Sequence, residues 1–311
     1  MAATVFQYEL VLGMPHTNHA GFAEHALLKY GAHFHWNSIA ATVGRPISTL
    51  RLASGEPVYA AVSFVDLRMP TRASLRGFKS DDRLRVLVFL RTLKGIVVEG
   101  RLVFDLHDRL PSLGGIVEEE AIEGLQRAHP TLRLSTTFIT PASGNSRLRL
   151  AAPADADFSS LPRMADEDNP HTLTKSGERT GRLDVLDERW LSIDSADDFS
   201  VTSSIDPDRD SNGAGLVYFA NYASFLDFSE RSALSANSRR RFSEHEILNR
   251  TTVHRRIAYY ANAALTDQVR IRPQVFEHPE HPDLIAFRCH VTRRTDERLI
   301  CLAETIKRLP S

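Results

Sequence analysis

Residues 212–229 read NGAGLVYFANYASFLDFS, the most apolar helix-length stretch of the chain. The stretch opens with Asn212, a favoured N-cap, and with Gly213 and Gly215, which would let a ligand approach the backbone closely. The first free amides of a helix carry a partial positive charge and can hold an oxyanion or a carbonyl oxygen. Apolar residues then cover most faces. The pattern predicts a helix from Asn212 to about Ala236 that strands bury on nearly all sides.

The same pattern occurs near the N-terminus, in residues 18–36, NHAGFAEHALLKYGAHFHW. Both copies precede several strand-like segments, which favours an internal duplication and predicts a second helix from Asn18 to about Ala41. At a constant offset of 194 residues, Asn18, Ala20, Gly21, Phe22 and Ala26 fall on Asn212, Ala214, Gly215, Leu216 and Ala220.

Composition indicates an ordinary globular protein of about two domains, with 311 residues, 42% hydrophobic and 25% charged. The 38 basic and 39 acidic residues balance, which disfavours nucleic acid and anionic membrane as partners. The first residues, MAATVFQYELVLG, lack the pattern of a secretory signal, so we expect a cytoplasmic location. The two cysteines, Cys289 and Cys301, flank a turn and could face each other across a hairpin. We expect both to be reduced and structural.

The order of segments predicts the α+β class, with a curved antiparallel sheet wrapped around a central helix in each half. Residues 151–181, rich in Pro, Asp and Ser, are predicted to link an N-terminal domain, 1–150, to a C-terminal domain, 182–311. Strands or extended segments are predicted at 6–13, 47–53, 57–67, 83–93, 96–106, 133–141 and 146–150, and again at 190–205, 251–262, 267–276, 284–293 and 298–308.

The segment GLVYFANYASFLDFSER resembles the central-helix motif of hot-dog acyl-CoA thioesterases, in which a catalytic aspartate precedes a glycine-containing turn. Aligning the two on Val217 and Tyr218 puts Asn212 at the position of that aspartate. An amide cannot act as the base or nucleophile of hydrolysis, but it can donate a hydrogen bond to a carbonyl or carboxylate. The departure argues against ordinary thioester hydrolysis.

The whole chain more closely resembles the double hot-dog acyltransferase/decarboxylase family of polyketide biosynthesis, typified by the leinamycin-pathway enzyme. The resemblance rests on GMPHTNHAGFAEHALL, the strand VYAAVSF, the helix NGAGLVYFANY and their order. It implies two hot-dog folds in one chain. It also implies that Tyr59 takes the acyl group from methylmalonyl-CoA, carbon dioxide is lost, and the propionyl group passes to an acyl carrier protein. Paired hot-dog halves imply that Tyr59 faces Asn212.

Two other functions stay open beside this one: a hot-dog acyl-CoA thioesterase or dehydratase, and a non-catalytic acyl-thioester-binding protein. The implied chemistry needs hydrogen-bond donors that stabilise a tyrosine phenolate and an enolate oxygen, and it needs no metal or cofactor apart from the coenzyme A of the substrate. The sequence also leaves a homodimer open. The predicted site residues are Tyr59 and Asn212 for catalysis, and His16, Thr17, Asn18, Gly21, Gly213, Gly215, Tyr218 and Arg240 for substrate binding.

Each of these residues has a structural alternative. An asparagine before a helix is usually a cap, and a tyrosine on a strand or helix usually packs in the core. Arg240 belongs to a basic run that could bind coenzyme A phosphates or an acidic carrier protein, or could simply be solvated. The run comprises Arg239, Arg240 and Arg241, with Arg250, Arg255 and Arg256 nearby.

Metal sites are not expected. The N-terminal histidines crowd together, but a carboxylate or cysteine that would complete a familiar ligand set is lacking. A calcium loop starting at Asp208 fails because its twelfth position is Phe219 rather than a glutamate. The N-terminal histidines are His16, His19, His25, His33 and His35.

Overall fold

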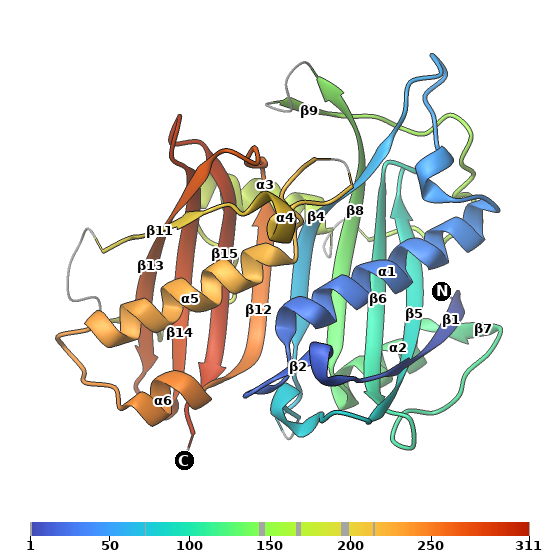
Figure 1. Cartoon of the computed structure of the whole chain (residues 1–311). Coiled ribbons are helices and arrows are strands. Elements are labelled where there is room, and N and C mark those ends of the chain that lie inside the picture. Colours follow the sequence, from blue (N-terminus) through green and yellow to red (C-terminus); the bar gives the residue numbers. More distant parts are fainter. Residues whose placement is uncertain are drawn as a thin grey trace. The chain divides into compact units, whose positions relative to one another are not determined.

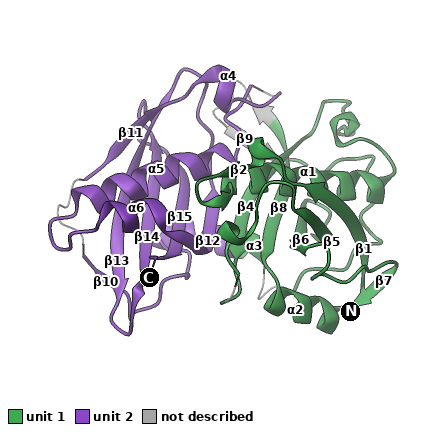
Figure 2. Ribbon diagram, turned by 60° about the horizontal axis from the view of Figure 1, so that its bottom comes forward, with its two compact units in different colours: residues 1–172 green, residues 173–311 purple. Residues whose placement is uncertain are grey.

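The computed structural model describes residues 2–71, 73–142, 147–165, 169–193, 199–213 and 215–310. The chain divides into two compact units, Met1–Thr172 and Leu173–Ser311 (Figure 2). The boundary between them falls inside the predicted linker, 151–181. Helix α3 (Pro170–Thr180) also lies in that segment.

Unit 1 is an antiparallel sheet with a long helix on one face (Figure 1). Its strands follow the spatial order β4-β8-β6-β5-β1-β7, with β9 paired to β8. The elements are β1 (Ala2–Val11), η1 (Met14–His16), β2 (Thr17–Asn18), β3 (Gly21–Phe22), α1 (Glu24–Val43), η2 (Ile47–Thr49), β4 (Tyr59–Arg68), η3 (Leu75–Gly77), β5 (Arg83–Leu93), β6 (Val97–Leu106), β7 (Ile116–Glu118), α2 (Glu119–Ala128), β8 (Thr131–Ala142) and β9 (Arg147–Leu150).

Unit 2 is built in the same way around α5 (Figure 1). Its strands follow the order β10-β13-β14-β15-β12, with β11 also paired to β13. The elements are β10 (Leu191–Ser192), β11 (Val201–Ser204), α4 (Pro207–Asp210), α5 (Asn221–Ala236), α6 (Glu244–Asn249), β12 (Thr251–Tyr259), β13 (Gln268–His278), β14 (His281–Arg293) and β15 (Leu299–Arg308).

The two units share one topology. In each, the matching strands are one before the long helix and four after it: β1, then β4, β5, β6 and β8 in unit 1, and β11, then β12, β13, β14 and β15 in unit 2. The spatial order β4-β8-β6-β5-β1 in unit 1 matches β12-β15-β14-β13-β11 in unit 2, position by position along the chain. The predicted α+β class and the predicted duplication are therefore confirmed at the level of topology.

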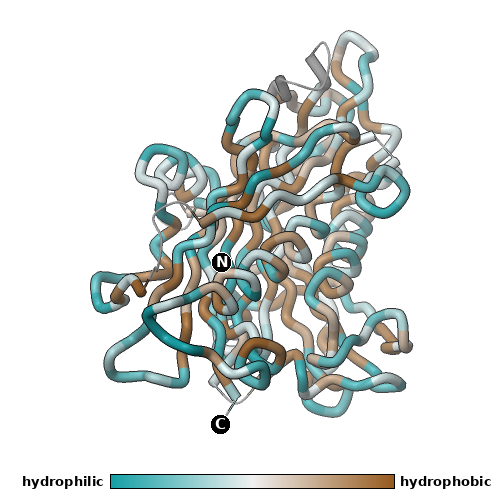
Figure 3. Tube along the Cα trace, turned by 60° about the vertical axis from the view of Figure 1, so that its left-hand side comes forward, coloured by the Kyte–Doolittle hydropathy of each residue, from teal (hydrophilic) through white to brown (hydrophobic). Residues whose placement is uncertain are grey.

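Residue alternation along β6 explains how unit 1 covers both faces of its sheet. Successive side chains of a strand point to opposite faces. Leu102 and Phe104 pack under α1, whereas Val103 joins an apolar cluster that contains Ile122 of α2. Figure 3 shows hydrophobic residues gathered in the strands and hydrophilic ones in many of the connecting loops. The long strands thus place apolar side chains on both faces of the sheet, one towards α1 and the other towards α2. This is why β5 and β6 are buried along nearly their whole length.

The predicted helix starts are wrong. Helix α1 begins at Glu24 and α5 at Asn221, and the residues before them, Ala23 and Ala220, make no side-chain cap. Asn18 instead turns the β2–β3 hairpin, where its Oδ1 accepts a hydrogen bond from the Ala20 amide over 2.8 Å. An asparagine side chain that can cap a helix can also close a turn, because both use the same hydrogen bond to a nearby amide.

The surroundings of α5 also differ from the prediction. The helix is not buried on all sides, since Phe228 is 48% exposed. On its sheet-facing side, Asp227 and Glu230 form ion pairs with Arg255 of β12 and Lys307 of β15. A buried ionic cluster therefore helps to hold this helix to its sheet, and the apolar pattern did not predict it.

Several local elements were not predicted. Residues 47–53 hold η2 and a single bridge at Arg51 rather than a strand. Strand β7 and helix α2 have no counterpart in the sequence prediction. Cys289 and Cys301 are buried free thiols, as expected. They are not directly opposite, because Cys289 pairs with Ala303 and Cys301 with Val291. Among the described helices, none is long and apolar enough to cross a membrane.

His35 makes the stability of unit 1 depend on pH. Burial lowers the pKa of His35 to about 3, from 6.5. Its Nε2 lies 3.0 Å from Thr136 Oγ1, and its Nδ1 has no hydrogen-bond partner among the described residues. The ring lies so close to Gly100 that a Cβ there would be 2.2 Å from Nδ1. The folded state therefore holds this imidazole neutral against the sheet.

We expect acid to destabilise the protein through His35. The unfolded state binds a proton below about pH 6.5 and the folded state does not, so stability is full above that pH and falls as pH drops towards 3. At about pH 5 this residue alone should remove about 2 kcal/mol. Urea unfolding at about pH 7.5 and pH 5 checks this for wild type, His35→Gln and the exposed control His33→Gln. An equal acid loss in wild type and His35→Gln would contradict the prediction.

Candidate functional site

In unit 1, His16 and Tyr30 form a polar pair beside the start of α1. The Gly13 amide donates to His16 Nδ1 over 2.8 Å, so the neutral ring carries its proton on Nε2. Nε2 lies 2.7 Å from the Tyr30 hydroxyl, and the two rings meet edge to face. His16, the predicted polar contact for substrate, is thus held in one tautomer with a tyrosine hydroxyl as its partner.

Tyr30 also borders the apolar interface between α1 and the sheet. The cavity there is only about 10 Å³, roughly the space of one water molecule. An acyl chain could enter this interface only if its side chains moved apart. The lining is otherwise hydrophobic: Leu10, Phe22, Leu27, Gly31, Phe34, Leu84, Val86, Leu102, Phe104 and Leu132.

Thr17 and Gly21 serve local structure. The Thr17 hydroxyl donates to the Met14 carbonyl and lies 3.2 Å from Ser80 Oγ. Gly21 has a φ of 87°, and a Cβ at this position would lie 2.3 Å from the Leu75 carbonyl oxygen. The space beside Gly21 is therefore filled by the backbone of η3, so its small size serves packing here rather than the approach of a ligand. Roles for Thr17, Asn18 and Gly21 in substrate binding remain predictions.

Tyr59 is the first residue of β4, where it pairs with Ile139 of β8. Its side chain is 40% exposed, unlike the usual core tyrosine of a strand. Among the described residues, no hydrogen bond to its hydroxyl is found. Tyr59 belongs to unit 1 and Asn212 to unit 2, so the expectation that they face each other stays a prediction.

Asn212 lies in a tight turn nine residues before α5, not at the helix start. Its Oδ1 accepts from the Leu216 amide over 3.1 Å, its own amide donates to the Leu216 carbonyl, and its carbonyl accepts from the Gly215 amide. Gly215 has a φ of 70°, which favours glycine, and neither Gly213 nor Gly215 has an atom within 4 Å of a Cβ built on it. The space beside both glycines is therefore open among the described residues, and their role in substrate binding stays a prediction.

Tyr259 at the end of β12 and Asn262 in the connection after it hold the segment between this turn and α5. The Tyr259 hydroxyl donates to the Phe219 carbonyl over 3.0 Å. Asn262 Nδ2 donates to the Val217 carbonyl over 3.2 Å, and Asn262 Oδ1 accepts from the Tyr222 hydroxyl over 3.0 Å. A segment anchored at several points keeps its shape when a ligand binds, which is what a preorganised site requires.

Tyr218 follows the turn directly, and its amide donates to the Asp210 carbonyl over 2.7 Å. Burial raises the pKa of the Tyr218 hydroxyl to about 12. This tyrosine therefore stays protonated and can act as a hydrogen-bond donor, consistent with the predicted role in binding and not with a nucleophile. Asp210, which the sequence analysis gave no catalytic role, is buried beside it and accepts from Arg209 through both carboxylate oxygens, over 2.8 and 2.7 Å.

The predicted basic cluster is not one surface. Arg250, Arg255 and Arg256 are buried; Arg255, for instance, donates to Glu230 and Thr305. Arg240 lies within 3.5 Å of Glu246 and 3.8 Å of Glu277 and stacks over the Phe242 ring. A phosphate would therefore have to compete with two carboxylates for Arg240. The sequence alone could not show which of these arginines are at the surface. Arg255 is buried on a strand, and its hydrogen-bond acceptors are distant in the sequence.

One group of potential metal ligands was missed. His278, Glu280 and His281 at the β13–β14 turn have ligand atoms within 4.8 Å of one another. Among the described residues, this is the one group of three such side chains that lie close enough to hold a metal ion. The N-terminal histidines do not belong to it. The Glu280 amide donates to His278 Nδ1 over 3.2 Å. The prediction that the protein needs no metal stays a prediction.

Solved structures share the architecture of the whole chain. The 12:0-ACP thioesterase from Umbellularia californica has a TM-score of 0.62, with 10% identity, over 98% of this chain and 98% of its own. An acyl-ACP thioesterase from Bacteroides thetaiotaomicron has a TM-score of 0.57, with 12% identity, over 97% of each chain. A protein assigned as an oleoyl thioesterase, from Lactobacillus plantarum, has a TM-score of 0.62, with 11% identity, over 99% of this chain and 98% of its own.

The chain has a double hot-dog fold. The central helices are α1 and α5, and each lies on the sheet of its own unit. At such low identities the likeness concerns the fold, and the activities named for those structures belong to those proteins. No model of a known protein family matches the sequence, and no curated protein matches it.

Proposed function

We propose that this double hot-dog protein is an enzyme that acts on acyl thioesters, as a bifunctional acyltransferase/decarboxylase. It would convert methylmalonyl-CoA to a propionyl group carried by an acyl carrier protein, in polyketide biosynthesis. The observation that carries the choice of reaction is the Asn212 turn. In the motif alignment, the amide of Asn212 falls where the thioesterases carry their catalytic aspartate. In the structure, the neighbouring Asp210 carboxylate accepts from Arg209 through both oxygens.

The proposed reaction has three steps. The Tyr59 oxygen attacks the thioester carbonyl, an ester forms, and the coenzyme A thiol leaves with the tyrosine proton. The bond to the free carboxylate then breaks, carbon dioxide leaves, and the electron pair forms an enolate that takes a proton from water at carbon. The carrier protein's thiol finally attacks the ester, which releases propionyl thioester and restores the tyrosine hydroxyl.

Asn212 is the proposed oxyanion donor. Because its Oδ1 already accepts from Leu216, the amide is oriented and its Nδ2 is the end that can donate to a substrate oxygen. A donor of this kind stabilises an enolate more than the ground-state carbonyl, since the negative charge develops on that oxygen. The exposed Gly213 and Gly215 leave the approach open.

Thioester hydrolysis is the second candidate, favoured by the likeness to solved thioesterases over nearly the whole chain. Incubation with methylmalonyl-CoA, with and without a carrier protein, separates the two. The proposal expects carbon dioxide release and propionyl-loaded carrier protein. A hydrolase would release methylmalonate and free coenzyme A at the same rate without any carrier protein. We also expect a cytoplasmic location, and a homodimer stays open.

We expect Asn212→Asp to slow decarboxylation about 100-fold or more, the usual effect of losing one oxyanion donor. The carboxylate can still accept from the Leu216 amide, so the turn should survive, but it would repel the malonyl carboxylate and the enolate. Carbon dioxide release is the measurement, with the exposed Asn37→Asp on α1 as control. Faster decarboxylation by Asn212→Asp would show that Asn212 is not an oxyanion donor.

A further inference from the structure

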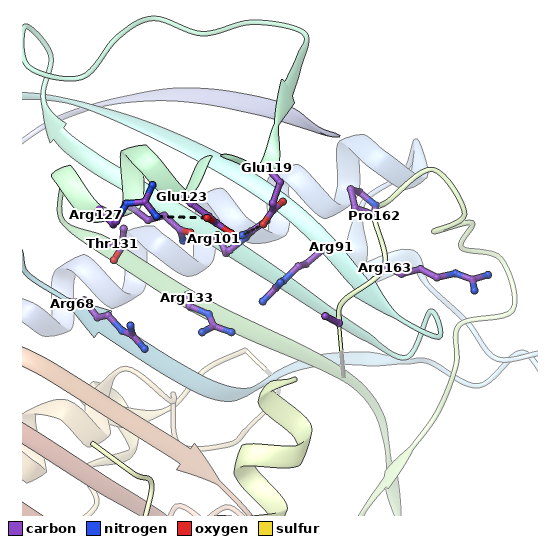
Figure 4. Close-up of a pocket in the computed structure, with 12 residues that line it drawn as sticks. Arg68, Arg91, Arg101, Glu119, Glu123, Arg127, Thr131, Arg133, Pro162 and Arg163 are labelled. Atoms are coloured by element: carbon purple, nitrogen blue, oxygen red, sulfur yellow. Dashed lines mark hydrogen bonds and ion pairs between the residues drawn. The ribbon is translucent and has the colours of Figure 1, made fainter. Parts of the chain in front are cut away.

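A pocket of about 520 Å³ lies on unit 1, lined mainly by arginines (Figure 4). It is on the sheet face opposite α1: Gly100 and Leu102 of β6 face α1, so Glu99 and Arg101 face the other way. Helix α2 and the 162–165 segment form its sides. The arginines are Arg68, Arg91, Arg101, Arg127, Arg133 and Arg163.

The floor of this pocket brings several charged side chains together. Arg101 of β6 and Arg133 of β8 are directly opposite in the ladder, an arrangement that costs stability when like charges have no counter-charge. Glu99, fully buried, accepts from Arg91 over 2.7 Å and from Arg133 over 2.9 Å. Glu99 thus serves two guanidinium groups at once and cannot also neutralise Arg101.

Arg101, which lines the pocket, keeps one buried donor without an acceptor in the described part of the chain. It is only 5% exposed, and both its terminal nitrogens donate to Glu119 of α2. Its Nε is buried and has no hydrogen-bond partner among the described residues. A buried N–H without an acceptor is costly, so this part of the pocket wall favours a nearby negative charge.

Arginine is the commonest residue type in the pocket lining. Six arginines line it, and their ion-pair partners include Glu99, Asp66, Glu119 and Glu123. Arginine stays protonated in proteins, so these side chains stay cationic at every working pH. The volume is that of a site for a small molecule, larger than one phosphate needs. The lining has no aromatic side chain to stack a nucleobase.

We propose that this pocket binds a small anion carrying two linked phosphate groups. Planar guanidinium groups match phosphate oxygens in pairs, and several directed at one space suit a diphosphate better than a single anion. The site is built from unit 1 alone and does not rest on the proposed function. The diphosphate could be free or could be part of coenzyme A, and the test separates these sources.

The test is calorimetric titration of the whole protein with sodium pyrophosphate, without metals and at fixed ionic strength. We expect saturable binding. Arg127→Ala should weaken it about tenfold or more, the usual effect of losing one charge-assisted hydrogen bond. Glu123→Gln should strengthen it, because it removes the rim carboxylate that competes for Arg127 over 3.6 Å. Both side chains are exposed, so folding should not change.

Arg83→Ala is the matched control, since Arg83 forms a similarly exposed pair with Glu9 outside the pocket. Displacement of pyrophosphate by coenzyme A would identify the coenzyme's diphosphate as a ligand, and lack of displacement would identify free diphosphate; both results support the site. Absence of saturable binding would overturn the proposal. Equal weakening by Arg127→Ala and Arg83→Ala would also overturn it, because it would indicate general charge attraction.

Discussion

Replacing Tyr59 with phenylalanine should abolish loading of the carrier protein while leaving the protein folded. The change removes the one oxygen that can form the proposed ester and keeps the ring. Because the Tyr59 hydroxyl is at an exposed position and makes no hydrogen bond found among the described residues, its loss should cost little stability. We expect transfer to fall by 1,000-fold or more, in the range seen when an enzyme loses its nucleophile.

The measurement is propionyl loading of a carrier protein by wild type and Tyr59→Phe, with circular dichroism to confirm folding. Carbon dioxide release should be followed in parallel, because the proposed donors at Asn212 remain in the variant. Tyr8→Phe is a suitable control, since Tyr8 is a strand tyrosine of the same unit whose hydroxyl bonds Ser38. A folded Tyr59→Phe that loads the carrier at the wild-type rate would exclude the tyrosyl ester and favour direct transfer or hydrolysis.

Removing Glu230 should produce the largest loss of stability. Its carboxylate is fully buried on α5 and lies 2.9 Å from both Arg255 and Lys307. Asp227 completes the cluster, within 2.8 Å of Arg255. Glu230→Ala leaves two buried cations with one anion, so we expect unit 2 to lose about 3–5 kcal/mol, the usual cost of breaking a buried ion pair on one side.

Urea unfolding measures this loss, and Asp283→Ala provides the control because Asp283 pairs with Arg308 at the surface of the same unit. The exposed pair should contribute less than about 1 kcal/mol. Acid should weaken the same cluster. Burial opposes ionisation of Asp227, but the charges of Lys307 and Arg255 outweigh it and lower its pKa. Its contribution is therefore full above the ordinary carboxyl pKa and is lost as pH falls below it. Equal losses for Glu230→Ala and Asp283→Ala would contradict the role of the cluster.

The sequence predicted the long strands well because their signal is local. The predicted strand 83–93 matches β5 in full, and 298–308 matches β15 to within one residue. Both are rich in apolar residues and follow a turn. Helix starts were harder to predict, because an Asn-Gly sequence suits a tight turn and a helix cap equally. Asn212 was therefore predicted as a helix cap, whereas its side chain closes a tight turn.

The features that could not be predicted from the sequence depend on contacts between residues that are distant in the chain. Glu230 and Arg255 look like ordinary charged residues until α5 and β12 come together. The arginine pocket likewise depends on strand pairing, since Arg91, Arg101 and Arg133 meet only through the register of β5, β6 and β8. Their alternation with apolar residues was visible, but the face they share was not. The His16–Tyr30 pair was half found, because only His16 was singled out.

The central claim is that Tyr59 carries the acyl group, and intact-protein mass spectrometry tests it most directly. The protein is incubated with methylmalonyl-CoA in the absence of a carrier protein, quenched in acid and weighed, and the modified peptide is then sequenced by fragmentation. The account predicts a propionyl or methylmalonyl adduct on the peptide that contains Tyr59, absent from Tyr59→Phe and removed by added carrier protein. An unmodified wild-type protein under conditions where coenzyme A is released, or an adduct on another residue, would contradict it.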